Sequence, residues 1–144
     1  MTTSAIPSPL LISTAHRREL ATRRAQALGC LTILMVLFIG MYAAMLEGVE
    51  PHPPAIRGPL IATALAMCAA ATVQFALATP SARWFGLAAA LLSWPGIGLH
   101  KFMTEAHPEP LAPVLLVGSA AALFLVIASF RCAPESNAAH RLVD

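Results

Sequence analysis

Charged side chains are scarce in this chain. Asp, Glu, Lys and Arg make up 11% of its 144 residues, whereas soluble domains contain roughly 25%. Hydrophobic residues reach 58%, above the roughly 45–50% of soluble domains. This composition disfavours a water-soluble globule, and it also disfavours intrinsic disorder, which requires low hydrophobicity and high net charge. The formal net charge is only +2, so nucleic-acid binding has no basis here. We therefore predict an integral membrane protein.

The sequence also lacks the motifs of enzymes and cofactor sites. It contains no glycine-rich phosphate loop, no nucleophile elbow and no zinc-protease His-Glu motif. The three cysteines, Cys30, Cys68 and Cys132, form no Cys-x-x-Cys pair. No histidine lies in the middle of an apolar segment, which disfavours haem held between helices. The sequence favours a non-enzymatic protein with no cofactor.

Four apolar segments are long enough to cross a bilayer, which takes roughly 20 residues. They cover residues 26–46, 60–78, 84–102 and 111–130, and the only charged side chain among them is Lys101, at the end of the third. The short connections carry prolines, which end helices. Short connections also place sequential helices side by side. The sequence predicts an all-α integral membrane protein, with residues 26–130 forming four transmembrane helices in an antiparallel up-down-up-down bundle.

Basic residues fall mainly on one side of this predicted membrane domain. Only Arg57 and Lys101 lie on the other side. Because basic residues accumulate in short cytoplasmic loops, we expect residues 1–25 and 131–144 to be cytoplasmic. The first apolar run exceeds the core of a signal peptide, so we expect it to be retained. Abundant Arg, Ala and Pro suggest a GC-rich bacterial genome. We therefore expect the membrane to be a bacterial inner membrane. The seven residues on the cytoplasmic side are Arg17, Arg18, Arg23, Arg24, Arg83, Arg131 and Arg141.

The residues before the first predicted span divide into two parts. Residues 1–11 contain Ser, Pro and Thr, and residues 14–24 are compatible with a short helix that carries four arginines. Basic side chains beside a membrane are attracted to anionic headgroups. Setting the topology accounts for these arginines, and docking of a partner is the alternative.

Small residues at four-residue spacing indicate where the helices pack, because membrane helices associate through close contact of small side chains. The second span carries Ala62, Ala66 and Ala70, and the fourth carries Gly118 and Ala122. We expect these two stripes to be helix seams. The alternative is that alanine is simply common in this chain.

Two polar or irregular features interrupt the apolar spans. Gln74 must find hydrogen-bond partners, because hydrocarbon offers none. Candidate partners are Thr63, Thr72 and Ser93, and the glutamine either links helices or lines a pathway. In the third span Pro95, Gly96 and Gly98 predict a kink or break after Trp94. Such a break marks either a binding site, as in many transporters, or a packing device.

Residues able to bind metal gather on the predicted outer side. Imidazole, carboxylate and thioether groups together can bind a transition metal, with methionine favouring Cu(I). No pair has the spacing of a known metal motif, so solvated loop residues are the alternative. The candidates are His52, His100, His107, Glu47, Glu105, Met45 and Met103.

A weak internal similarity relates the first and third spans. Residues 39–47 and 97–105 are identical at four positions, Ile, Gly, Met and Glu, at an offset of 58. This pattern is compatible with a parallel repeat of two helical hairpins, and chance similarity is the alternative.

Two main functional hypotheses follow from these features, and a third alternative is an enzyme that uses the outer carboxylates and histidines on a lipid or quinone substrate. The first is a non-catalytic accessory or assembly subunit of a membrane complex, which contacts lipids and either other membrane subunits or copies of itself. Its basis is the small-residue seams, the short loops and the lack of charge within the spans. The second is an oligomeric carrier or channel for a small solute or metal ion, with an outward His/Glu/Met mouth.

Overall fold

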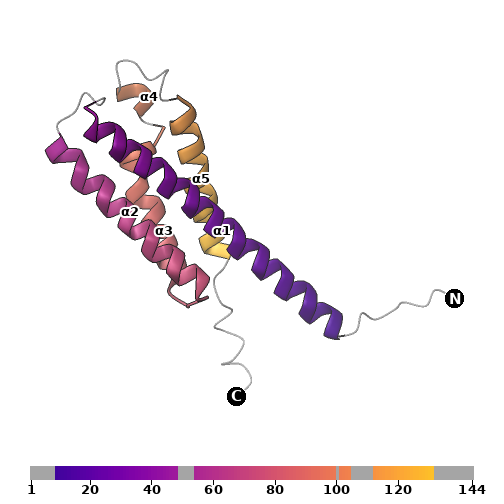
Figure 1. The fold of residues 1–144 in the computed structure, drawn as a ribbon. Helices are drawn as coiled ribbons and strands as arrows, with labels where there is room; N and C mark the ends of the chain where they lie inside the picture. Colours follow the sequence, from indigo (N-terminus) through magenta and orange to yellow (C-terminus); the bar gives the residue numbers. More distant parts are fainter. Residues whose placement is uncertain (1–8, 49–53, 100, 105–111, 132–144) are drawn as a thin grey trace.

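The structure is a computed structural model that describes residues 9–48, 54–99, 101–104 and 112–131. Within these stretches the regular structure is entirely α-helical, so the predicted all-α class is confirmed for them. The helices are α1 (Pro9–Leu46), α2 (Pro54–Ala76), α3 (Ala82–Ile97), α4 (Lys101–Thr104) and α5 (Ala112–Arg131) (Figure 1).

Three of the helices contain segments that are long and apolar enough to cross a membrane. These segments are Arg17–Leu46, Gly58–Ala76 and Ala112–Arg131. They correspond to the first, second and fourth apolar segments of the sequence. The prediction of membrane-type helices is confirmed to that extent.

The third apolar segment is divided in the structure. The helix α3 has 16 residues, which gives a length of about 24 Å at a rise of about 1.5 Å per residue. It ends at Ile97 because Gly98 has an extended backbone, with φ −70° and ψ 149°. The chain turns there and forms the single helical turn of α4. The expected segment of residues 84–102 is therefore not one continuous helix.

The first helix is longer than the predicted span. It runs without interruption for 38 residues from Pro9, and its N-terminal part extends past the ends of the other helices (Figure 1). The expected boundary between residues 25 and 26 is not a helix end. Residues 14–26 contain neither Pro nor Gly, and Glu19 pairs with Arg23 one turn later. These features favour continuation of the helix.

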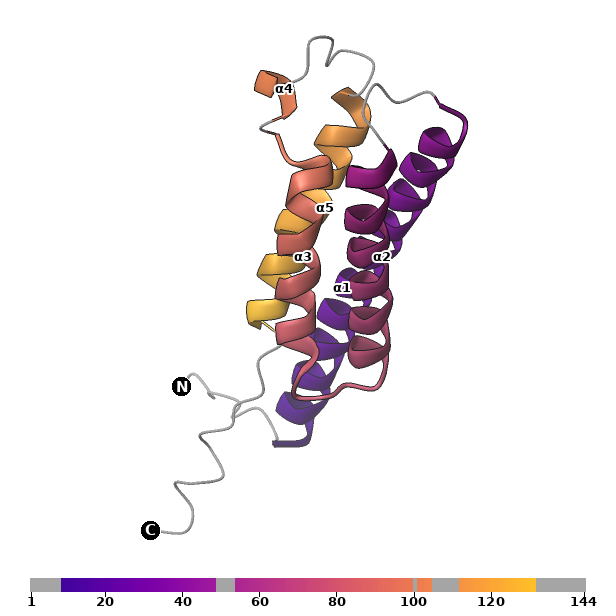
Figure 2. The same ribbon diagram turned by 90° about the vertical axis from the view of Figure 1, so that its left-hand side faces the viewer.

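The long helices α1, α2, α3 and α5 lie side by side (Figure 2). The helices α1 and α3 each contact both α2 and α5. The short α4 lies beyond the C-terminal end of α3 (Figure 2). Each of the four long helices is thus packed against two others.

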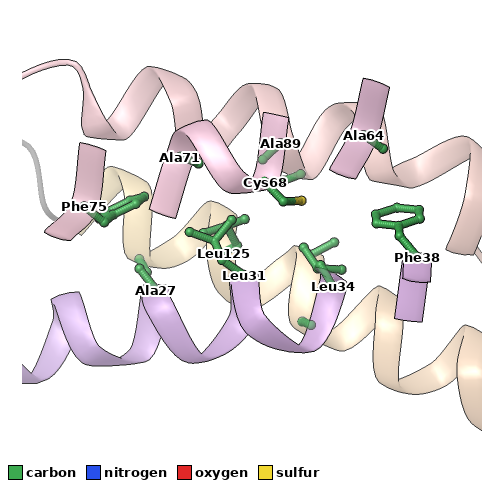
Figure 3. Close-up of a cluster of buried hydrophobic side chains, with 14 of the residues drawn as sticks. Ala27, Leu31, Leu34, Phe38, Ala64, Cys68, Ala71, Phe75, Ala89 and Leu125 are labelled. Atoms are coloured by element: carbon green, nitrogen blue, oxygen red, sulfur yellow. The ribbon is translucent and has the colours of Figure 1, made fainter. Parts of the chain in front are cut away.

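Side chains with heptad-like spacing form the core between these helices (Figure 3). On α1 the buried positions advance by four, three and four residues, and α2 follows a similar pattern. This spacing keeps one stripe of a helix facing its neighbours. The labelled core residues are Ala27, Leu31, Leu34, Phe38, Ala64, Cys68, Ala71, Phe75, Ala89 and Leu125.

The expected seam of α2 lies on the opposite face. Ala62 and Ala66 are exposed and Ala70 is only partly buried, whereas Ile61 and Phe75 are buried in the core. The bulky side chains fill the space between α1 and α3, so the alanine stripe points away from the neighbouring helices. In contrast, the expected seam residues Gly118 and Ala122 of α5 are buried.

The two segments with internal similarity have different structures. Gly40 lies inside the continuous helix α1, whereas the matching Gly98 lies in the break between α3 and α4. Glu105 is outside the described residues. The local structures therefore give no support to a parallel repeat.

Candidate functional site

At the C-terminal end of α3, a side chain from α5 forms a hydrogen bond with a backbone carbonyl. Pro95 lies inside α3 and has no amide hydrogen to donate. The amide of Gly98 donates to the carbonyl of Trp94 at 2.7 Å, and the hydroxyl of Ser119 donates to the carbonyl of Ile97 at 2.8 Å. Ser119 is buried. The break that the sequence predicts thus occurs three residues after Trp94, and the carbonyls of Trp94 and Ile97 both have partners within the protein.

Two glycines allow α3 and its neighbours to approach closely. A Cβ atom on Gly118 would lie 2.8 Å from Cδ1 of Ile97. A Cβ atom on Gly96 would lie 3.1 Å from Cε1 of Phe38 on α1. Gly96 and Ile97 are therefore packed against α1 and α5, whereas Pro95 is exposed. This arrangement agrees with the packing interpretation of the break better than with an open binding site.

Near the other end of α3, a small residue makes a second close contact. A Cβ atom on Gly86 would collide with Oγ of Ser129 and would lie 2.9 Å from Cε2 of Phe75. Gly86 belongs to a stripe with Ala82 and Ala90, and all three are buried. The sequence interpretation missed this stripe, although its four-residue spacing is the same signal that was noted in the second and fourth spans.

Gln74 binds the turn between α2 and α3. Its Oε1 atom accepts a hydrogen bond from the hydroxyl of Thr79 and one from the hydroxyl of Ser81 at 2.9 Å. The amide of Thr79 also donates to the carbonyl of Gln74. Gln74 thus fixes a short connection near the end of α2.

The partners expected for Gln74 are engaged within their own helices. The hydroxyls of Thr63, Thr72 and Ser93 donate to carbonyls four residues earlier, at 2.7–2.8 Å. The expectation that they pair with Gln74 is wrong. Serine and threonine side chains in helices commonly form this local bond, which satisfies them without a second helix.

Three of the seven metal candidates, Met45, Glu47 and Met103, lie in the part of the chain that the structure describes. Met45 is buried and lies against Gly58, whereas Glu47 and Met103 are exposed. His52, His100, His107 and Glu105 lie outside the described residues. Among the described residues, no group of three or more His, Cys, Asp or Glu side chains is placed to hold a metal ion.

The exposed face of α2 differs from the exposed faces of the other long helices. Beside the exposed Leu60 and Thr63, one stripe of its exposed positions advances by four, three, four and three residues. This stripe carries four alanines and one valine: Ala62, Ala66, Ala69, Val73 and Ala76. We call this set the outer face of α2. The exposed face of α5 instead carries bulky side chains such as Leu116, Leu123, Phe124 and Phe130. The outer face is therefore a smooth strip that no other described helix covers.

An arginine joins the first and last helices. The Nη1 atom of Arg23 on α1 donates to the carbonyl of Arg131 at the C-terminal end of α5, at 3.0 Å. Arg23 also pairs with Glu19. Because the C-terminal end of a helix carries partial negative charge, a guanidinium there is stabilising. The basic stretch of α1 and the basic end of α5 are thus held together.

No protein-family model matches this chain, and comparison with curated proteins and with solved structures found no similar protein.

Proposed function

We propose that this protein is a non-catalytic accessory or assembly subunit of a membrane complex, and that the outer face of α2 is its contact with a partner helix. The observation that carries the proposal is the exposure of four alanines and a valine with heptad-like spacing on that face. Lipid chains are as apolar as leucine, so helices in a bilayer associate where small side chains permit close backbone approach. An alanine strip outside the core has this property.

The proposal includes a specific membrane arrangement. The long helices α1, α2, α3 and α5 cross a bacterial inner membrane in an up-down-up-down order, with both termini on the cytoplasmic side. The clustering of basic residues on one side of the spans supports this orientation. The contact between Arg23 and the end of α5 supports it as well, because it joins two segments that the orientation assigns to the same side.

The short helix α3 is compatible with a crossing. Its length of about 24 Å is less than the hydrocarbon thickness of about 30 Å. The turn at Gly98 and the following α4 extend the chain further. The hydroxyl of Ser119 covers the carbonyl of Ile97, which matters because irregular backbone within a membrane must be satisfied by protein or water.

The carrier hypothesis has less support from the described residues. Gln74 holds a turn, and Met45 packs against Gly58. Gln74, one of the residues expected to line a pathway, and Met45, one of the residues expected at the mouth, thus have structural roles, and we favour the subunit hypothesis.

Co-purification tests the subunit hypothesis. The tagged protein is isolated from native membranes in mild detergent, as wild type and as the double variant Ala66→Leu and Ala69→Leu. We expect the wild type to retain a second membrane protein in constant stoichiometry. The double variant should lose it, because two leucines separate the helix backbones.

The matched control is Ala120→Leu, the same substitution at an exposed position of α5. It should leave the partner bound and the amount of protein unchanged. Recovery of the wild type without a partner, or equal loss of the partner in the control, would contradict the proposal. A self-contained oligomer that the double variant loses would show that α2 contacts a second copy of this chain and not another subunit.

A further inference from the structure

An open groove lies between α1 and α5 at the end where Arg23 meets Arg131. It has a volume of about 470 Å³. Arg23, Gln26 and Arg131 line it at that end. Ile33 and Phe124 line it further along, about 15 Å along α1 from Arg23 and about 10 Å along α5 from Arg131 at a rise of about 1.5 Å per residue. The groove is therefore polar and basic at one end and apolar at the other.

The basic end carries two guanidinium groups against one nearby carboxylate. Arg23 uses one N–H on the carbonyl of Arg131 and one on Glu19. A guanidinium has five N–H donors, so these two contacts leave others for a ligand. The side chain of Arg131 is exposed. Arginine binds phosphate groups well because its planar fork can donate two parallel hydrogen bonds.

The floor of the groove is open because of a glycine. A Cβ atom on Gly29 would meet no atom within 4 Å, and Gly29 lines the groove between its two ends. An extended apolar ligand can therefore lie against the backbone of α1 as it passes from the arginines toward Ile33.

We infer that this groove binds an anionic phospholipid of the cytoplasmic leaflet. Its phosphate lies at Arg23 and Arg131, and one acyl chain follows Ile33 and Phe124 along α1 and α5. Charge complementarity selects this occupant, since basic pockets between membrane helices on the cytoplasmic side suit anionic headgroups. The inference relies on the membrane orientation proposed above and is independent of the outer face of α2.

Native mass spectrometry of the full chain in detergent tests the headgroup contact. The protein is mixed with equal amounts of phosphatidylglycerol and phosphatidylcholine that have identical acyl chains. We expect phosphatidylglycerol to be the main bound lipid. Arg131→Gln should lower the ratio of the two bound lipids by about five-fold, the effect of one basic side chain near anionic lipid. This variant keeps the backbone carbonyl that Arg23 contacts.

The charge control is Arg17→Gln with Arg18→Gln, which removes two exposed arginines from the same helix outside the groove. It should leave the lipid ratio unchanged. An equal fall in this control would show general attraction to a basic helix and would overturn the inference. Absence of a phosphatidylglycerol preference in the wild type would overturn it as well.

A second pair of variants tests the shape of the groove without changing charge. Gly29→Leu fills the groove and should reduce the occupancy of both lipids several-fold. Gly40→Leu is the matched control, because Gly40 is also an exposed glycine of α1 with open space around it. Unchanged occupancy in Gly29→Leu would contradict a groove-bound lipid.

The two proposals can fail separately. The double variant Ala66→Leu and Ala69→Leu should keep the lipid ratio of the wild type, whatever its effect on co-purification. Loss of lipid selectivity in that variant would contradict independent sites.

Discussion

At the scale of single residues, the hydroxyl of Ser119 links α5 to α3. It donates to the carbonyl of Ile97 from a position 22 residues away. Among the described residues, no other side chain is shown to bind the same carbonyl. The buried hydroxyl of Ser129 instead donates within its own helix, and that of Ser93 donates within its own helix and also pairs with Cys68 on α2. The three serines thus have similar burial and different structural importance.

Ser119→Ala should therefore destabilise the protein more than Ser129→Ala. Removing the Ser119 hydroxyl leaves a buried carbonyl without this partner, which costs about 1–3 kcal/mol. Loss of the Ser129 hydroxyl leaves the carbonyl of Leu125 available to the normal helical bond from the backbone. The measurement is the loss of helical circular dichroism during titration with dodecyl sulfate in mixed micelles. Equal midpoints for the two variants would contradict this role of Ser119.

At the scale of helices, the contact between α3 and α5 depends on small residues. Gly86 faces Ser129, and Gly118 faces Ile97. These contacts lie near opposite ends of α3, so the two helices remain close over most of their shared length. Such packing supplies much of the association energy of membrane helices, because burial of apolar surface from lipid contributes little.

Gly86→Val should separate α3 from α5 and α2. Its new side chain would enter space held by Oγ of Ser129 and the ring of Phe75, and such overpacking costs about 1–3 kcal/mol. The same detergent titration measures the effect. Gly40→Val introduces the same residue where a Cβ has open space, so it controls for the helix propensity of valine. Similar stability of the two variants would show that the close approach is unimportant.

The packing of α2 also explains why the sequence alone does not show which of its alanine stripes faces the neighbouring helices. Alanines occupy both its buried and its exposed face, including Ala64 and Ala71 inside and Ala62 and Ala66 outside. Spacing alone identifies a stripe but not the direction in which it points. The positions of Ile61 and Phe75 decide the direction, because their side chains fill the core.

At the scale of the whole molecule, the proposed orientation can be tested directly. Reporters for the outer and inner side are fused or inserted at residues 5, 52, 81 and 140 in separate proteins. We expect only the reporter at residue 52 to lie outside, because the side proposed to be cytoplasmic carries seven of the nine basic residues. An external reporter at residue 5 or 140 would contradict the proposed orientation. A cytoplasmic reporter at residue 52 would contradict the first two crossings.

The amino-acid sequence by itself determined the all-α class of this protein and the approximate location of its helices. Hydrophobic length, the scarcity of charge and the proline-bearing connections are local properties, and they act before any helix finds a neighbour. The break near Pro95 and Gly98 was visible for the same reason, although its position was displaced by three residues.

Only the tertiary structure decided which residues meet. It placed Gln74 on the turn at Thr79 and Ser81, Ser119 on the carbonyl of Ile97, and Arg23 on the end of α5. It also decided that the outer face of α2 is exposed and that a groove lies between α1 and α5. The physical reason is that helix rotation and pairing depend on side-chain volume and hydrogen bonds between residues distant in the chain, which periodicity within one segment does not encode.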